Sequence, residues 1–236
     1  MNIFSFYFQA SKIIVLIFLL SNLFLFPIHA KKTYFFKQDA PYEIHLFGGN
    51  TLDQTNYYAM SPNSFWNLAN VFNSNTRFYN SRIIMLGATR ELDYKMRFLN
   101  FALEADLGKH YGVMNHWEGD LLFVAKIKNI GDLPFHFSMG EGISYASKTP
   151  TLENASIGYD LLRRRTNYTF EIETRPLLNY LMMEVEFGSY ESSYPRVFVR
   201  IHHRSGVFGL YCDFPPGCGS NYLTYGIRLP LTFIDK

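Results

Sequence analysis

A histidine and a serine lie two positions apart, at His203 and Ser205, in the segment RIHHRSGVF. In an extended strand, residues i and i+2 point to the same side, with Cα atoms roughly 6 to 7 Å apart. At that separation an imidazole can take the proton of a serine hydroxyl, which prepares the serine to attack an ester. The spacing therefore predicts a nucleophile, Ser205, and its general base, His203. The alternative is that both are ordinary polar residues near a membrane surface, satisfied by headgroups or loop backbone.

The pair belongs to the apolar row of the strand that carries it. One face of this strand holds Val197, Val199, Ile201, His203, Ser205 and Val207. The other face holds Arg196, Arg200, His202 and Arg204. Unpaired polar groups in hydrocarbon cost several kcal/mol. If the apolar row faces lipid, the pair needs a partner there, and the lipid itself is one candidate.

Apolar and polar residues also alternate along seven other segments of roughly ten residues, about what a tilted strand needs to cross a bilayer. They are YEIHLFGG, RIIMLGATREL, FALEADLGKH, WEGDLLFVAKIK, FHFSMGEGISYAS, NYLMMEVEFGS and YLTYGIRLPLTF. Eight strands make the smallest common closed barrel. The sequence thus predicts an all-β fold, an eight-stranded antiparallel β-barrel.

The connections between these segments favour a transmembrane barrel over a soluble one. Three connections are short, DYKM, NIGDLP and the residues around ESSYP. They alternate with long ones at 50–81, 148–177 and 211–219, with a short exception at 111–116. Outer-membrane barrels have short periplasmic turns and longer outer loops. In that topology the apolar rows face lipid, and His203 and Ser205 lie near the outer rim, at the ester-bearing depth of the outer leaflet.

The polar rows then face the lumen, where Arg196, Arg200, Arg204 and Arg228 oppose Glu184 and Glu186. An ion pore is one interpretation. Because side chains just fill an eight-stranded barrel, we expect a closed charge network instead. Glu141 has the parity of the lipid-facing row, and the glycines on both sides of it predict a bulge that turns it inward.

The chain begins with an apolar run from Ile13 to Phe26 after a single cation, Lys12. We interpret residues 1–30 as a secretory signal peptide cut after Ala30, with a retained membrane anchor as the alternative. Residues 31–236 form one domain, the barrel. The net charge of +2 is too small to suggest a nucleic-acid partner, whereas 17 Tyr and 23 Phe fit an apolar environment.

The two cysteines, Cys212 and Cys218, lie close together in YCDFPPGCGS. An exported chain meets an oxidising compartment, so we expect a local disulfide. A metal site is disfavoured, because no further Cys or His lies nearby with zinc spacing. We expect no metal and no other cofactor.

The segment RIHHRSGVFGLY, followed by GSNYLTYGIRLPLTF, resembles the C-terminal hairpin of the lipid A 3-O-deacylase family (PagL), eight-stranded outer-membrane esterases. The segments HWEGDLLFVAKIK and FSMGEGISYAS also resemble related proteobacterial barrel proteins with the same HHRSG stretch. The motif match covers about the last forty residues.

This resemblance implies catalysis by His203 as base and Ser205 as nucleophile. Two positions depart from the family. The residue after the serine is Gly206 where the family has an oxyanion-binding asparagine, so we expect a backbone N–H, or Arg204 bending over the rim, to replace it. No glutamate follows Ser205, so Asp213 is the candidate acid that orients the histidine.

Two functions remain open. The first is an esterase that removes an ester-linked acyl chain from lipid A, the lipid anchor of lipopolysaccharide, or from a similar lipid in the outer membrane of a Gram-negative bacterium. The cluster Arg163–Arg165 would lie near its phosphates or on a solvated loop. The second is a barrel with a structural or surface-interaction role. A small-solute channel is disfavoured by the bulky lumen row, and the sequence leaves open whether the barrel forms a homodimer.

Overall fold

The structure is a computed structural model, and it describes residues 42–52, 78–130, 133–153, 174–190, 194–207, 210–212 and 218–231. The predicted signal peptide, the Arg163–Arg165 cluster and Asp213 lie outside the described residues.

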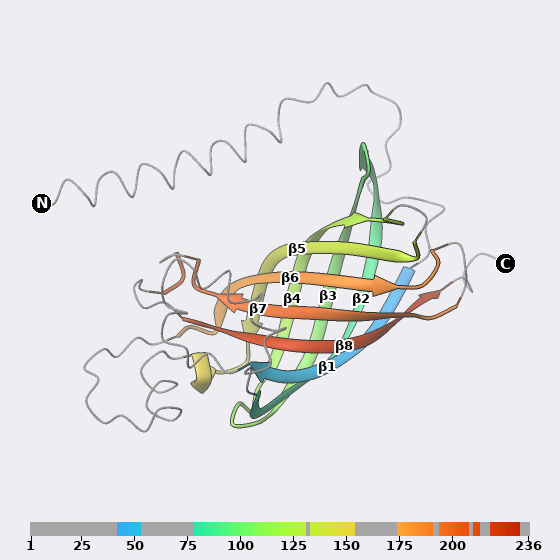
Figure 1. Cartoon of the computed structure of the whole chain (residues 1–236). Coiled ribbons are helices and arrows are strands. Elements are labelled where there is room, and N and C mark those ends of the chain that lie inside the picture. Colours follow the sequence, from blue (N-terminus) through green and yellow to red (C-terminus); the bar gives the residue numbers. More distant parts are fainter. Residues whose placement is uncertain are drawn as a thin grey trace, which may run out of the picture. The chain divides into compact units, whose positions relative to one another are not determined.

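Eight antiparallel strands pair in chain order, and β1 pairs with β8 to close the barrel (Figure 1). The strands are β1 Tyr42–Leu52, β2 Phe78–Met96, β3 Leu99–Gly112, β4 Trp117–Ile127, β5 Phe135–Ala146, β6 Leu177–Phe187, β7 Arg196–Ser205 and β8 Gly219–Leu231. A short 3-10 helix, η3 Thr151–Glu153, follows β5. The predicted all-β, eight-stranded antiparallel barrel is confirmed.

The barrel has an apolar outside and a charged inside. On β3, for example, Leu107 is 59% exposed, whereas Glu104 is 1% and Asp106 is 4% exposed. On β4, Leu121 is 54% exposed while Glu118 is 1% exposed. A soluble barrel has the reverse arrangement, so this surface is that of a barrel which spans a membrane with its strands. Among the described residues, no helix is both long and apolar enough to cross a bilayer.

Short and long connections alternate around the barrel with one exception. Met96 ends β2 only a few residues before Leu99 begins β3, and the connections from β4 to β5 and from β6 to β7 at the same end are also short. The connections at the other end join β1 to β2, β3 to β4, β5 to β6 and β7 to β8, and the exception is the short β3–β4 connection at residues 113–116. We call this second end the outer end, by the topology of membrane barrels. Ser205, the last residue of β7, lies at the outer end.

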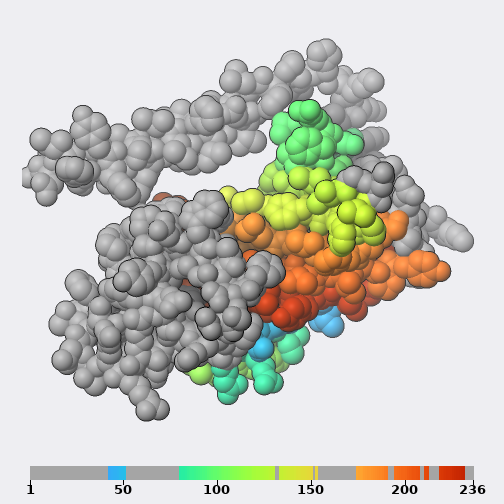
Figure 2. All heavy atoms as spheres, viewed as in Figure 1, coloured from blue at the N-terminus to red at the C-terminus, as the bar shows by residue number. Residues whose placement is uncertain are grey.

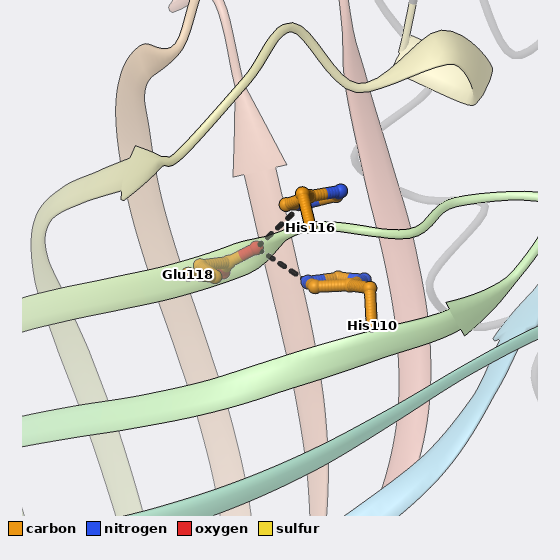
Figure 3. A group of neighbouring side chains, drawn as sticks. All are labelled: His110, His116 and Glu118. Atoms are coloured by element: carbon orange, nitrogen blue, oxygen red, sulfur yellow. Dashed lines mark hydrogen bonds and ion pairs between the residues drawn. The ribbon is translucent and has the colours of Figure 1, made fainter.

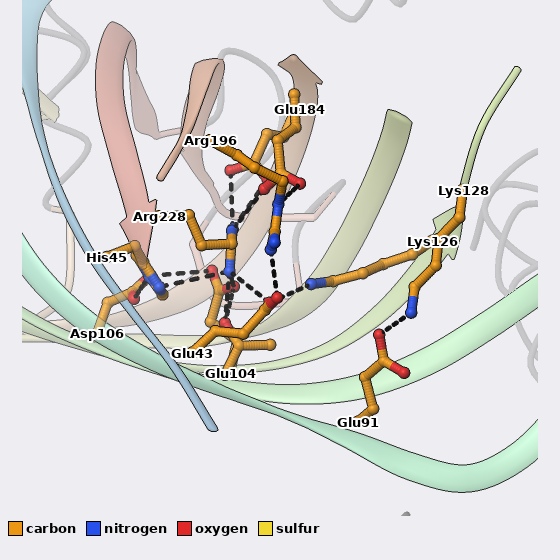
Figure 4. A network of polar contacts seen from close by, with 12 residues as sticks. Glu43, His45, Glu91, Glu104, Asp106, Lys126, Lys128, Glu184, Arg196 and Arg228 are labelled. Atoms are coloured by element: carbon orange, nitrogen blue, oxygen red, sulfur yellow. Dashed lines mark hydrogen bonds and ion pairs between the residues drawn. The ribbon is translucent and has the colours of Figure 1, made fainter. Parts of the chain in front are cut away.

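Arginines and carboxylates fill the lumen and pair with one another (Figure 4). Arg200 contacts Glu184 at 2.7 Å and Glu104 at 2.8 Å. Arg228 contacts Glu184 at 2.9 Å and Glu186 at 2.7 Å. These buried pairs, which include one between the neighbouring strands β6 and β7 and one across the lumen to β3, form the closed charge network that the sequence predicts.

Glu141 corrects one sequence-based expectation. It pairs in regular register with Phe123 of β4 and Leu181 of β6, and its side chain is exposed on the outer face. The flanking Gly140 and Gly142 do not form a bulge. A Cβ added to Gly142 would lie 1.9 Å from the carbonyl oxygen of Leu121, so this glycine serves close strand packing instead.

Candidate active site on the outer face

The side chains of His203 and Ser205 both lie on the outer face of β7, two positions apart. Both are half-buried, whereas the neighbouring His202 and Arg204 are completely buried in the lumen. The face assignment made from the alternation is therefore correct. No hydrogen bond joins the His203 and Ser205 side chains within the described part of the chain. Their separation is that of residues i and i+2 on one strand, which the two side chains can close by rotation about their χ1 bonds.

A hydrogen bond from the neighbouring strand orients His203. Its Nδ1 lies 2.5 Å from Oδ1 of Asn221, its cross-strand partner on β8. With Nδ1–H donating to the amide oxygen, Nε2 carries the lone pair and can act as a base. Asn221 therefore takes the orienting position for which the sequence suggested Asp213. Asp213 itself lies outside the described residues.

Further polar residues surround the pair on the same face. Asn179 of β6 is the cross-strand partner of Ser205, and Leu181 of β6 is the partner of His203. Leu181 also pairs with Glu141 of β5, so the carboxylate lies two strands from the imidazole in the same row. We call Glu141, Asn179, His203, Ser205 and Asn221 the outer-face polar cluster. Figure 2 shows the barrel from the side on which β5 to β8 lie toward the viewer, drawn from lime to red.

The end of β7 is held by a disulfide between Cys212 and Cys218. A Cβ added to Gly206 would lie 2.1 Å from Sγ of Cys212, so only a glycine fits under the disulfide. The N–H of Gly206 donates to the carbonyl of Cys218 at 3.1 Å. This N–H is already engaged, so the expected oxyanion donor at Gly206 is not free for that role.

Arg204 is also differently placed from the expectation. It is 0% exposed inside the barrel, and its Nη1 contacts both carboxylate oxygens of Glu153 at 2.9 and 3.0 Å. Its Nη2 donates to the carbonyl of Pro176 at 2.8 Å. A guanidinium held in this way from within the lumen does not bend over the rim toward lipid. The amide of Asn179, next to Ser205, is the better-placed donor for an oxyanion.

The sequence contained a signal for Asn221 and Asn179, but it was weak. Asn221 has the parity of Leu223 and Tyr225 on the predicted apolar row, and Asn179 has the parity of Leu181. Neither residue is an acid, so neither is an obvious candidate for the group that orients a catalytic histidine. Their position beside His203 and Ser205 follows only from the strand register, which the sequences of the connections leave undetermined.

A second group of titratable side chains lies inside the barrel near its outer end. His110, His116 and Glu118 can each direct one ligand atom to a common point, with these atoms within 4.8 Å of one another (Figure 3). All three side chains are buried. These are described residues that could hold a metal ion.

Comparisons with known proteins bear on the fold alone. No family model matches the chain, and no curated protein matches it. Among solved structures it is similar to the outer membrane enzyme PagL, with 13% identity over 80% of this chain and 99% of that chain at a TM-score of 0.48. It is also similar to Neisserial surface protein A (NspA), with 8% identity over 80% and 96% of the chains at a TM-score of 0.41. The N-terminal β-barrel domain of Pseudomonas aeruginosa OprF matches with 11% identity over 80% and 98% at 0.38.

Proposed function

We propose that this barrel is an outer-membrane esterase that removes an ester-linked acyl chain from lipid A, or from a similar lipid of the outer leaflet. The observation that carries the proposal is the hydrogen bond between His203 and Asn221 on a lipid-facing surface, directly beside Ser205. Polar residues that face lipid are costly and are therefore commonly functional. An oriented imidazole two positions from a serine is the arrangement that nucleophilic ester hydrolysis requires.

The reaction proceeds in two steps. Ser205 Oγ attacks the ester carbonyl carbon while its proton passes to Nε2 of His203. The alkoxide of the lipid then leaves with that proton, and the acyl chain stays on Ser205. Water attacks the acyl-serine, its proton passes to His203 and returns to Ser205 Oγ, and a free fatty acid is released. In both steps the amide of Asn179 donates to the developing oxyanion.

The outer face below the cluster accommodates the chain to be removed. Below His203 and Asn221, the paired residues of β7 and β8 are Ile201 with Leu223 and then Val199 with Tyr225. An apolar depression follows, lined in part by Val197, Ile227 and Gly48. An acyl chain with its ester at Ser205 can therefore follow the two strands into the membrane.

The test compares lipid A from cells that carry the wild-type protein or a variant, by mass spectrometry. Ser205→Ala and His203→Ala should each leave the acyl pattern intact, and in purified enzyme each should lower kcat about 10³-fold or more. Because both residues serve one step, the double variant should be no worse than either single one.

Ser144→Ala is the matched control. Ser144 is a buried serine of β5 that faces the lumen and not the outer-face polar cluster, so its removal should leave activity intact. Heat-modifiable migration in detergent gels verifies that every variant is folded. An identical acyl pattern with wild-type protein and with Ser205→Ala would reject the esterase and leave the non-enzymatic, structural barrel.

A further inference from the structure

The outer end of the lumen holds more negative than positive charge. Three buried carboxylates gather there, Glu118, Asp120 and Glu153, each at most 5% exposed. Within the described part of the chain, one guanidinium pairs with them, that of Arg204, which lies 2.9 Å from Glu153 and 3.7 Å from Glu118. When all three are ionised, two negative charges are left without a fixed counter-charge. A buried carboxylate without a counter-charge is strongly destabilising, so the site favours the entry of a cation or of protons.

Several polar atoms in the same place have no hydrogen-bond partner. They are both ring nitrogens of His116, both carboxylate oxygens of Asp120 and Nδ1 of His202. All belong to buried side chains, exposed to 5% or less. The rest of the lumen differs, because each of its carboxylates on β1, β3 and β6 contacts at least one of Lys126, Arg196, Arg200 and Arg228, whereas Asp120 contacts no such cation within the described part of the chain. The uncompensated charge and the unpartnered atoms thus coincide at one end of the barrel.

The groups nearest one another there are metal ligands by type. Glu118 Oε2 lies 2.7 Å from Nε2 of His110 and 3.8 Å from Nε2 of His116 (Figure 3). Tyr222 OH lies 2.9 Å from Nδ1 of His110, so the two nitrogens of that ring face different partners. A second group that fixes the far nitrogen of a histidine is a regular feature of zinc sites. His202 Nε2 holds the other oxygen of Glu118 at 2.7 Å.

We propose that His110, His116 and Glu118 bind one divalent transition-metal ion of the zinc type. Imidazole nitrogens with one carboxylate suit Zn²⁺ and its first-row neighbours, whereas Ca²⁺ and Mg²⁺ require oxygen ligands. An ion of charge +2 would balance the negative charge that Arg204 alone does not neutralise. The rings of His110 and His116 are stacked, with centroids 4.0 Å apart and planes at 17°. Binding therefore turns the His116 ring toward Glu118, and this ring has no hydrogen bond to lose.

This site is independent of the proposed esterase, since its residues face the lumen and the outer-face polar cluster faces lipid. The metal has a structural role, in which it fastens β3, the β3–β4 connection and β4 at the outer end. Protonation of the same histidines or of the buried carboxyls is the competing way to balance the charge, and metal binding and protonation can be separated by experiment.

The experiment uses the folded full-length barrel in detergent, without a histidine tag and stripped with a chelator. Zn²⁺ is added, free metal is removed, and bound zinc is measured by mass spectrometry and by titration calorimetry. We expect one zinc per barrel, a higher unfolding temperature with zinc, and no retention of Ca²⁺ or Mg²⁺. Substitution by Co²⁺ should produce visible d–d absorption of a nitrogen- and oxygen-ligated site.

His116→Ala should weaken zinc binding at least about 10-fold while the barrel still folds, because this ring has no hydrogen-bond partner to leave behind. Glu118→Gln should weaken binding likewise. His203→Ala is the matched control, because His203 lies on the outer face and not in the lumen. This variant should bind zinc as tightly as wild type does. The proposal is overturned if the wild-type barrel retains no zinc, or if wild type and His116→Ala retain equal amounts. Protons would then balance the charge.

Discussion

At the scale of single residues, the orienting partner of His203 is an amide and not an acid. Asn221 Oδ1 fixes the tautomer of the imidazole but supplies no charge to stabilise its protonated form. Asn221→Ala should therefore lower kcat roughly 10- to 100-fold, with little change in KM. Steady-state hydrolysis of a soluble ester or of lipid A in detergent measures this change.

Asn221→Asp tests whether Asn221 orients the imidazole of His203 or only packs against it. A carboxylate keeps the acceptor for Nδ1 and favours the protonated imidazole, so activity should return and the acid side of the pH profile should move to higher pH. If Asn221→Ala and Asn221→Asp are equally inactive with unshifted profiles, Asn221 has only a structural role.

Asn179 is the residue that we expect to bind the oxyanion. Asn179→Ala should lower kcat about 10²- to 10³-fold, because one donor to the tetrahedral intermediate is lost. Asn179→Asp should not restore the rate, since an ionised carboxylate accepts hydrogen bonds and donates none. Asn80→Ala, at an exposed position of β2, serves as the matched control and should keep its rate. Equal rates for Asn179→Ala and wild type would remove Asn179 from the mechanism.

The sequence indicated one part of this candidate site and not the other, for a physical reason. His203 and Ser205 are neighbours in sequence, and strand parity alone places both on one face. Asn221 and Asn179 reach them from β8 and β6, so their placement depends on strand register. A shift of one residue would have moved each of them into the lumen. The connection across Cys212–Cys218 bears on the register of β8 against β7, and the connection between β6 and β7 bears on the register of β6 against β7. Neither connection has a periodicity that could be interpreted.

At the scale of elements, η3 is fastened into the outer end of the barrel by one carboxylate. Glu153 is 1% exposed and accepts from Ser220 at 2.6 Å as well as from Arg204. Burial raises the pKa of Glu153 above its ordinary value, despite Arg204, and nearby Glu118 raises it further. Of the other charged groups that face it, His116 acts in the opposite direction.

The raised pKa of Glu153 predicts how the docking of η3 depends on pH. A carboxyl whose pKa is raised by docking favours the docked state most below its ordinary pKa, and this contribution is lost as pH rises through the raised pKa. Hydrogen exchange of the peptide that contains Thr151–Glu153, corrected for the intrinsic rate, should show less protection at pH 7.5 than at pH 4.5. Glu153→Gln does not titrate, so its protection should be constant. A wild-type protection that is constant, or rises with pH, would contradict the prediction.

Glycines near a lipid-facing carboxylate show where local sequence rules fail in this barrel. Gly140 and Gly142 predicted a bulge at Glu141, yet β5 pairs regularly with β4 and β6 along its whole length. Close contacts account for the glycines: a Cβ at Gly142 would lie 1.9 Å from the carbonyl oxygen of Leu121, and a Cβ at Gly140 would lie 3.1 to 3.2 Å from side chains of Val124, Leu122 and Met182. Whether a glycine forms a bulge or relieves crowding depends on what lies on the neighbouring strands, which the sequence alone does not contain.

At the scale of the whole molecule, the charged lumen takes the place of an apolar core. Arg200 is completely buried and contacts Glu104 and Asp106 of β3 and Glu184 of β6. Arg200→Met would leave these carboxylates without their shared partner and should destabilise the barrel by about 3 to 5 kcal/mol. Urea unfolding in lipid vesicles measures the loss.

The control for Arg200→Met is Arg82→Met, the same change at an exposed position of β2. An exposed arginine contributes little, so the unfolding free energy should change by less than about 1 kcal/mol. Similar unfolding curves for the two variants would mean that the lumen network is not what holds the barrel together.

The location of the outer-face polar cluster also has a consequence for the biogenesis of the protein. Its members come from β5 to β8, and Asn221 reaches His203 only after the last hairpin has formed. The disulfide that packs on Gly206 forms only after export. Under the proposed function, a nascent chain would therefore be an inactive precursor. The inner membrane would be protected from a lipase in transit, because activity would begin only when the protein is inserted among its substrates.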